Sequence, residues 1–252
     1  MERPPKSSLK MPSETRKNQA GQSHDKEKPK FWRFLTAPES SFSPQGLLNM
    51  CRPATFSLEK DTVMLSYSDN VANYCTPFSC GDSDLDDFFQ KDALLYDREY
   101  LGRTYAWIDQ SVPSQIVGMI TLANDSIKAR YITTSSARNR LQRNITNAKR
   151  GRSYPAVLIG RLGVSETYQN KGYRIGSQIL NFIKDWFRSS NNKTGCRFIV
   201  VDAYNNMPTL RFYEKNGFKP LFKNQEDELR FFGLDTDQLL RTRFYYFDLK
   251  WL

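Results

Sequence analysis

The sequence contains one histidine among its 252 residues, and that histidine, His24, lies in a polar stretch near the N-terminus. A Ser-His-Asp triad needs a histidine beside its nucleophile, and catalytic zinc sites depend on histidine ligands. We therefore expect neither kind of site. Any proton transfer must fall to carboxylates, tyrosine, lysine or water.

Cysteine is also scarce: Cys51, Cys75, Cys80 and Cys196 form no Cys-x-x-Cys pair. We expect free thiols in a reducing compartment and no metal. No run approaches the roughly 20 apolar residues of a membrane helix. Basic residues near the N-terminus precede no apolar stretch, so we expect no secretory signal and no membrane contact. The sequence predicts a soluble, cytoplasmic protein.

The formal net charge of +10 is unevenly distributed. Residues 1–60 hold eleven basic and six acidic residues, a net charge of +5. Up to about Lys30 this stretch is too poor in aliphatic residues to offset the entropy of ordering. We predict a basic, disordered extension over residues 1–55, followed by one folded domain over residues 56–252.

A second basic segment runs from Lys128 to Arg152, with eight basic residues, no acid and a net charge of +8. Two interpretations stay open: a solvated connector, or a patch that attracts phosphate groups.

The order of predicted elements indicates a single α/β domain with a mixed sheet. Ser83 and Asp86 predict a capping pair that opens a helix. Ile175, Ile179 and Ile183 lie on one apolar face of another helix. The predicted strands are Arg103–Asp109, Gln115–Asn124, Ala156–Val164, Arg197–Tyr204 and Arg243–Lys250, and a helical insertion is predicted over Asp227–Thr242.

The junction Tyr168–Ser177 joins a predicted strand to a helix and contains Gly172 and Gly176. Glycines let a backbone approach a ligand closely, and the free N–H groups of a helix start attract anions. Lys171 and Arg174 add positive charge. A pyrophosphate is the natural ligand of such a turn.

Three blocks of sequence follow one another in the second half of the chain. They are Gly160–Val164 (GRLGV), Tyr168–Ser177 (YQNKGYRIGS), and Asn205 with Leu210–Phe218 (LRFYEKNGF). In this order and spacing they resemble the GNAT superfamily of N-acetyltransferases, over roughly Phe56–Lys250. The resemblance implies a mostly antiparallel mixed sheet, flanked by helices, whose central parallel strands splay into a V-shaped cleft.

The resemblance also implies roles for individual residues. Backbone groups of Leu162, Gly163 and Val164 would pair with the pantetheine arm of acetyl-CoA, and one N–H would polarise the thioester carbonyl. The residues implied to hold the pyrophosphate are Gln169, Lys171, Gly172, Arg174, Gly176 and Ser177. Asn205 would also contact the coenzyme.

Tyr213 would protonate the departing thiolate, which suits a phenol with a pKa of about 10. Its other interpretation is a packed aromatic beside Leu210. The general base is left open among Glu166, Asp202 and a water relay. The turn departs from the family pattern: either Arg174 stands where the first glycine is expected, or the loop contains two extra residues.

The front of the chain carries Phe78-Ser79-Cys80-Gly81 and then Leu85-Asp86-Asp87-Phe88. This phrase resembles the opening of the acetyltransferase toxins of bacterial toxin–antitoxin modules. Those relatives acetylate the amino group of aminoacyl-tRNA and are neutralised by ribbon-helix-helix antitoxins. The resemblance implies both partners here and leaves a homodimer open.

Under this hypothesis the basic segment lies beside the active cleft and contacts the tRNA acceptor stem. The residues involved would be Arg138, Arg140, Arg143, Lys149, Arg150 and Arg152. Two alternatives remain: an enzyme that acetylates a small amine or a protein amine, and a non-catalytic acetyl-CoA-binding module, which the altered turn at Arg174 favours.

Overall fold

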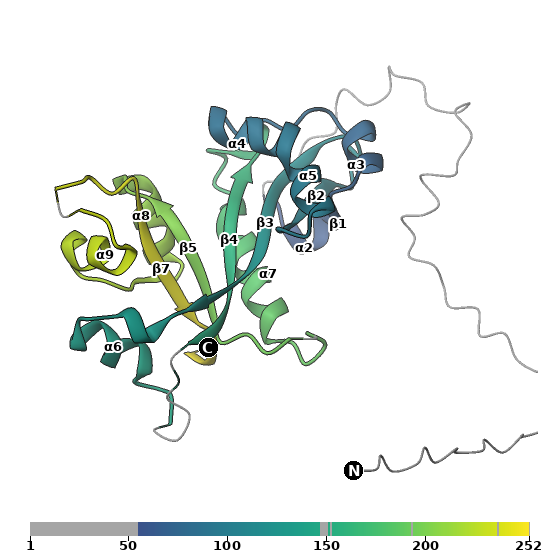
Figure 1. Cartoon of the computed structure of the whole chain (residues 1–252). Coiled ribbons are helices and arrows are strands. Elements are labelled where there is room, and N and C mark those ends of the chain that lie inside the picture. Colours follow the sequence, from purple (N-terminus) through teal and green to yellow (C-terminus); the bar gives the residue numbers. More distant parts are fainter. Residues whose placement is uncertain (1–54, 147–150, 152, 193, 236, 252) are drawn as a thin grey trace, which may run out of the picture. The chain divides into compact units, whose positions relative to one another are not determined.

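The computed structural model describes residues 55–146, 151, 153–192, 194–235 and 237–251 (Figure 1). The predicted N-terminal extension lies outside these residues except for its last one, so the domain boundary at residue 56 stays a prediction. The strands are β1 (Thr62–Ser66), β2 (Arg103–Asp109), β3 (Ile116–Ile127), β4 (Tyr154–Val164), β5 (Phe198–Tyr204), β6 (Lys219–Pro220) and β7 (Thr242–Asp248).

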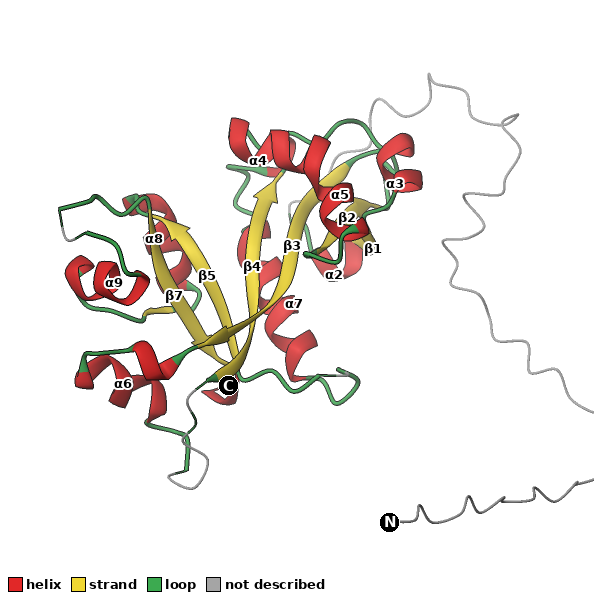
Figure 2. Cartoon of the chain, viewed as in Figure 1, coloured by secondary structure: helices red, strands yellow, loops and turns green. Residues whose placement is uncertain are grey.

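Helices flank the sheet formed by these strands (Figure 2). They are α2 (Leu58–Asp61), α3 (Asp69–Tyr74), α4 (Ser83–Asp87), α5 (Ala93–Arg98), α6 (Ser135–Gln142), α7 (Ile175–Arg188), α8 (Met207–Lys215) and α9 (Gln225–Phe232). A π-helical turn, Phe88–Asp92, joins α4 to α5, and short 3-10 turns span Ala129–Tyr131, Glu166–Tyr168 and Leu249–Trp251.

The seven-stranded sheet has the order β1-β2-β3-β4-β5-β7-β6. Only the central pair, β4 and β5, is parallel, and it is joined for just four residues on each strand, Ala156–Ile159 against Phe198–Val201. Beyond these residues the two strands separate, as Figure 2 shows. The predicted fold, a mixed and mostly antiparallel sheet splayed at its parallel strands, is confirmed.

A β-bulge lies where the splay begins. Leu122 of β3 pairs with Ile159, but the neighbouring Thr121 pairs with Arg161, so Gly160 is an extra residue in β4. An extra residue reverses which face each later side chain points to. Ile159 and Leu162 both contact the core under α7, whereas the Arg161 guanidinium lies 5.0 Å from the centre of the Phe88 ring on the opposite face.

Two hydrophobic layers cover the sheet. On one face, called here the α7 face, α7 and α8 pack Ile179, Ile183 and Tyr213 against β3, β4 and β5. On the other face, called the α4 face, Phe88, Phe89 and Ala93 of the α4–α5 segment cover β2 and β3. On that same face, α6 packs against β4, β5 and β7. The split between β4 and β5 therefore connects two differently covered faces.

Several predicted elements are confirmed. Strand β2 begins and ends at the predicted residues, and β3 runs three residues further than predicted, to Ile127. Helix α7 buries Ile175, Ile179 and Ile183, as their spacing predicted. Free thiols are confirmed for Cys75, Cys80 and Cys196.

The predicted cap at Ser83 is wrong by one residue. A side-chain oxygen of Asp82 accepts hydrogen bonds from the N–H groups of Asp84 and Leu85, both at 3.1 Å. Asp86 instead accepts from the N–H of Cys80 at 2.7 Å and from the Ser79 hydroxyl at 2.9 Å. Aspartate and serine are equally good helix caps, so local preference could not separate them.

The helix predicted over Asp227–Thr242 is too long. Helix α9 ends at Phe232, because Gly233 adopts a left-handed conformation with φ of 69°. A glycine in this conformation is a common helix terminator.

The described part of the basic segment is not a solvated connector. It forms α6, which buries Ala137 and Leu141. The Arg138 guanidinium donates to the Ile132 carbonyl, and the Arg140 guanidinium donates to the Pro220 carbonyl at 3.1 Å. Two of the predicted phosphate-binding arginines thus also hold the fold together.

Candidate active site

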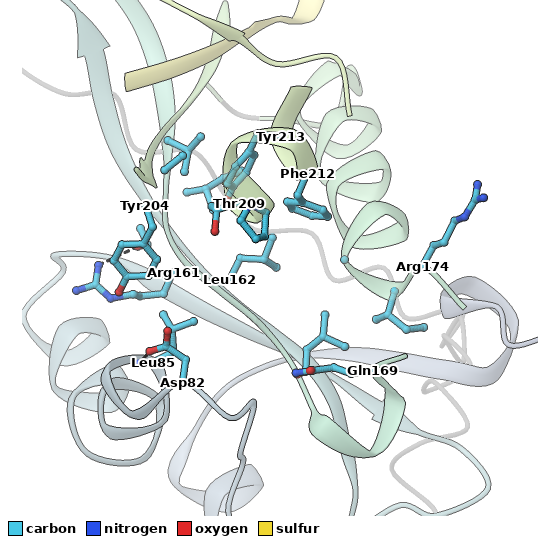
Figure 3. A pocket seen from close by; sticks show the side chains of 18 of the residues that line it. Asp82, Leu85, Arg161, Leu162, Gln169, Arg174, Tyr204, Thr209, Phe212 and Tyr213 are labelled. Atoms are coloured by element: carbon cyan, nitrogen blue, oxygen red, sulfur yellow. Dashed lines mark hydrogen bonds between the residues drawn. The ribbon is translucent and has the colours of Figure 1, made fainter. Parts of the chain in front are cut away.

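A cavity of about 750 Å³, called here the cleft, opens where β4 and β5 separate. It reaches both faces of the sheet, so it has an α7 side and an α4 side. Its labelled side chains in Figure 3 come from β4, β5, α4, α8 and the turn before α7. The α7 side holds Leu162, Val164, Gly176, Phe212 and Tyr213, and the α4 side holds Asp82, Asp84, Arg161, Asp202 and Tyr204.

The backbone of β4 directs polar groups toward the cleft. Because the N–H of Ser165 donates to the Val117 carbonyl, the pair Gly118–Val164 is a non-hydrogen-bonded one. Val164 and, two residues earlier, Leu162 therefore direct their N–H and C=O groups away from β3. The pairing with β5 has already ended there, so these groups face the split. The Val164 carbonyl accepts from the Gln169 side chain, which leaves the Val164 N–H and both groups of Leu162 for a ligand.

The turn before α7 presents donors as well. Among the described residues, no acceptor contacts the N–H groups of Gly172–Ser177. Gly172 and Arg174 both have positive φ, 75° and 53°. Arg174 thus adopts the left-handed conformation that glycine adopts without strain, which explains why a glycine is expected there. Its side chain extends away from Phe212 and Tyr213 (Figure 3).

Gly176 brings the start of α7 close to α8. A Cβ atom at this position would lie 3.1 Å from the Phe212 ring. The free N–H groups and this close approach fit a pyrophosphate-bearing ligand, because backbone N–H groups at a helix start bind phosphate oxygens.

Six of the predicted coenzyme residues line the cleft and four do not. The cleft is lined by Leu162, Val164, Gln169, Gly172, Arg174 and Gly176 but not by Gly163, Lys171, Ser177 or Asn205. The Asn205 side chain donates to the Leu240 carbonyl at 2.9 Å. A Cβ at Gly163 would meet the Phe78 ring at 3.0 Å, so this glycine admits the α4 segment rather than a ligand.

Gln169 lines the cleft, but its amide has protein partners. The amide nitrogen donates to the carbonyl oxygens of Cys80 at 2.8 Å and Val164 at 2.7 Å. It ties the turn, the end of β4 and the α4 segment together. Sequence spacing alone gave no sign of this bond.

Tyr213 lines the α7 side of the cleft and is 7% exposed. Its ring lies 5.1 Å from the centre of Phe212 and 5.4 Å from that of Phe218. Burial raises the pKa of the Tyr213 phenol above its usual value. The phenol therefore stays protonated at neutral pH, as a proton donor must.

Besides Asp202, the α4 side of the cleft carries charged side chains that the sequence did not single out as site residues. The Tyr204 hydroxyl donates to the Asp84 carboxylate at 2.8 Å, so it joins β5 to α4 across the split. The buried Arg161 Nε has no hydrogen-bond partner among the described residues. No motif or spacing in the sequence singled out Tyr204.

The two carboxylates considered as general base occupy different places. Asp202 lines the cleft, whereas Glu166 lines a separate hollow of about 140 Å³ and bonds the Ser79 hydroxyl at 2.9 Å. Burial, together with Asp125 and Glu228, raises the pKa of Asp202 to about 6.

The basic segment does not line the cleft at any of its described residues. The expectation that it lies beside the cleft is wrong, because β3 and β4 are antiparallel. The segment leaves the sheet where Ile127 pairs with Tyr154, eight residues before Leu162. Eight strand residues span about 26 Å. Lys149, Arg150 and Arg152 lie outside the described residues.

Within the described ranges no cluster of His, Cys, Asp or Glu could hold a metal ion. No helix in the described part of the chain is long and apolar enough to span a membrane.

Comparison with known proteins gives the class of this fold and site. The family model of the acetyltransferase (GNAT) domain matches residues 102–220. This range includes β2 to β6, the turn before α7 and most of the cleft. The chain therefore contains a GNAT acetyltransferase domain, and the protein is an acetyltransferase.

Several solved structures share this fold. A tyrosine-to-phenylalanine mutant of KacT is 15% identical, with a TM-score of 0.53, over 76% of this chain and 96% of its own. AtaT complexed with acetyl-methionyl-tRNAfMet is 18% identical, with a TM-score of 0.51, over 75% and 96%. AtaTR bound with AcCoA is 20% identical, with a TM-score of 0.50, over 75% and 94%.

AtaT is described as a toxin. At these identities the likeness establishes a shared fold. No curated protein matches the sequence.

Proposed function

We propose that this acetyltransferase transfers the acetyl group of acetyl-CoA to the amino group of aminoacyl-tRNA. The observation that carries the proposal is the cleft itself, which has backbone donors on its α7 side and charged side chains on its α4 side. Such a cleft accommodates a thioester and an amine on opposite faces of one sheet. The AtaT structure with acetyl-methionyl-tRNAfMet supports this choice of acceptor.

The α7 side is the donor side in this proposal. The backbone groups of Leu162 and the N–H of Val164 pair with the pantetheine arm, as a neighbouring strand would. The N–H groups from Gly172 to Ser177 hold the pyrophosphate. The AtaTR structure with AcCoA supports the choice of coenzyme. Gly163, Lys171 and Asn205 do not line the cleft and leave the proposed contact set, whereas Ser177 stays in it for its backbone N–H at the start of α7.

Acetyl-CoA supplies an activated carbonyl, and this chain's residues orient it. A free N–H of the β4 backbone stabilises negative charge on the carbonyl oxygen as the amine attacks. Tyr213 lies on the side of the cleft that receives the coenzyme. Its raised pKa keeps a proton available for the thiolate that leaves.

The α4 side is the acceptor side. Helix α6 packs on the same face of the sheet, so a nucleic acid whose 3′ end enters the cleft can extend over α6. Phosphate contacts of this kind give affinity without sequence specificity. The role proposed for the basic segment is therefore to hold the tRNA body away from the reacting atoms.

The test is incubation of the enzyme with labelled acetyl-CoA and bulk charged tRNA. We expect label in the aminoacyl fraction and none in uncharged tRNA. Arg138 and Arg140 are poor choices for charge reversal, because both bond backbone carbonyls. Arg130→Glu with Arg143→Glu, at two exposed positions, should weaken tRNA binding while sparing the KM for acetyl-CoA. Unchanged tRNA binding in this variant would refute the role of the segment.

A second acceptor class is favoured by one observation. The α4 side carries the carboxylates Asp82, Asp84 and Asp202, which attract a small cationic amine. Release of free coenzyme A in the presence of polyamines, without acetylation of charged tRNA, would establish that alternative. Binding of acetyl-CoA without turnover on any amine would instead indicate a non-catalytic module.

A ribbon-helix-helix antitoxin, a homodimer and a cytoplasmic location remain predictions. A small ribbon-helix-helix protein encoded beside this reading frame, and its co-purification with the enzyme, would test the first. Sedimentation of the purified chain would test the second.

A further inference from the structure

Acetylation of an amine requires a group that accepts a proton from nitrogen. Among the described residues, Glu166 is badly placed for this task. Its carboxylate bonds the Ser79 hydroxyl and faces its own small hollow rather than the cleft. A proton acceptor must lie within hydrogen-bond reach of the reacting nitrogen, directly or through one water.

Asp202 lies where the two arms of the cleft diverge. Val201, the residue before it, forms the last pair between β4 and β5, with Ile159. The next residue on β4 is the bulged Gly160, which has no side chain to fill the space opposite. Asp202 pairs with Phe244, whose side chain lies on the α4 face. Asp202 therefore lies on the α4 face and lines the acceptor side of the cleft.

Two charged groups from neighbouring elements act on Asp202. Asp125 approaches from β3 and Glu228 from α9, and both raise the pKa of Asp202. Glu228 is itself paired with Arg243 of β7, at 2.6 Å. The other ionisable groups on this side of the cleft are Asp82, Asp84, Arg161 and Tyr204.

We propose that Asp202 is the general base that accepts the proton of the acceptor amine. The neutral amine attacks the thioester carbonyl carbon, and the new C–N bond forms as the carbonyl electron pair moves to oxygen. Asp202 takes the excess proton from nitrogen. The oxyanion collapses, the C–S bond breaks, and the sulfur takes a proton from Tyr213. Solvent then removes the proton from Asp202 and restores the one lost by Tyr213.

This inference rests on the proposed amine acetylation but not on the identity of the amine. A base acts only when it is ionised, so activity should rise with pH as Asp202 loses its proton. With a pKa of about 6, Asp202 is ionised at neutral pH and remains basic enough to accept a proton.

The experiment compares pH profiles of kcat at saturating L-methioninamide for the full-length enzyme, Asp202→Asn and Asp125→Asn. Asp202→Asn should lower kcat at neutral pH by about 100-fold or more, with the KM for acetyl-CoA unchanged. The loss should shrink at high pH, where hydroxide replaces the missing base. A loss of the same factor at every pH would overturn the proposal, because a merely structural role gives that result.

Asp125→Asn is the matched control, because Asp125 does not line the cleft but its charge acts on Asp202. It should keep the full kcat at high pH and move the acidic limb of the profile to lower pH. An unmoved limb would overturn the proposal. Glu166→Gln should leave the profile unchanged, and loss of the acidic limb in that variant would assign the base to Glu166 instead.

Failure of the proposed function is a separate outcome. If methioninamide is acetylated and charged tRNA is not, the acceptor assignment fails and Asp202 is still judged by its pH profile. If neither is acetylated, NMR titration of the aspartate carboxyls decides. An Asp202 pKa of about 6, against an ordinary value of about 4, would support the site if the Asp202 pKa is lower in the Asp125→Asn variant. An ordinary value would overturn it.

Discussion

The two sides of the cleft present different kinds of chemical group. The α7 side presents mainly backbone groups, those of Leu162, Val164 and the turn from Gly172 to Ser177, with one phenol at Tyr213. The α4 side presents charged side chains, Asp84, Arg161 and Asp202 among them. Backbone groups persist through most substitutions, whereas side chains change with each one. Under the proposed function, the coenzyme side is therefore fixed by the fold, whereas acceptor choice depends on a few replaceable residues.

The largest effect should come from removing the phenol on the α7 side. Tyr213→Phe keeps the ring among Phe212 and Phe218 and deletes only the hydroxyl. A lost general acid costs about 100- to 10,000-fold in rate. Steady-state kinetics should show this fall in kcat with an unchanged KM for acetyl-CoA. Tyr204→Phe is the control on the opposite side and should retain most of kcat. A fully active Tyr213→Phe enzyme would remove the acid from the mechanism.

A smaller effect, confined to the acceptor, should follow a change on the α4 side. Arg161→Met keeps an unbranched chain over the Phe88 ring and removes the guanidinium. Hydrogen bonds from charged groups contribute about 1.5–3 kcal/mol, so the acceptor KM should rise about tenfold or more. The KM for acetyl-CoA should not change. An equal rise in both constants would show that the two sides are not separable.

The third effect concerns stability. Asp202→Asn should stabilise the fold although it should lower the rate of acetyl transfer. The pKa of Asp202 is raised to about 6 in the folded protein. A carboxyl with a raised pKa favours its protonated form, so its ionisation destabilises the fold as pH rises through this range. Asp202→Asn should therefore raise the melting temperature at pH 7 and have no effect at about pH 3. A variant that melts lower at pH 7 would contradict this.

The smallest effect is expected in the turn. Arg174→Ala and Arg174→Gly remove the same guanidinium, but only glycine adopts φ of 53° without strain. Left-handed backbone costs a residue other than glycine about 1 kcal/mol. Chemical denaturation should show Arg174→Gly to be more stable than Arg174→Ala by about that amount. Equal stabilities would mean that the turn stores no strain.

The sequence predicted most of what depends on local pattern. Ile175, Ile179 and Ile183 repeat at helical spacing, and helix α7 buries all three. The strand-like alternation along Arg103–Asp109 predicted both ends of β2 correctly. The donor side could be predicted in outline because strand, turn and helix follow one another along the chain.

The acceptor side could not be predicted, because it is made by contacts between distant residues. Asp84 and Tyr204 are 120 residues apart and meet only when the sheet is complete. Gln169 and its partner, the Cys80 carbonyl, are 89 residues apart in the sequence. No spacing rule reports such contacts. The predicted location of the basic segment was wrong for the same reason. Strand direction, not sequence proximity, decides which end of the sheet the segment occupies.

The extra residue in β4 has a consequence for how the acceptor side could change. Because Gly160 is an extra residue, the alternation of side chains between the two faces is reversed after it. Arg161 points to the α4 face because of that shift, and Leu162 points to the α7 face for the same reason. A one-residue deletion here would leave every side chain in the sequence intact and exchange their sides. Under the proposed function, the chain length at this single point determines which residues face the coenzyme and which face the acceptor.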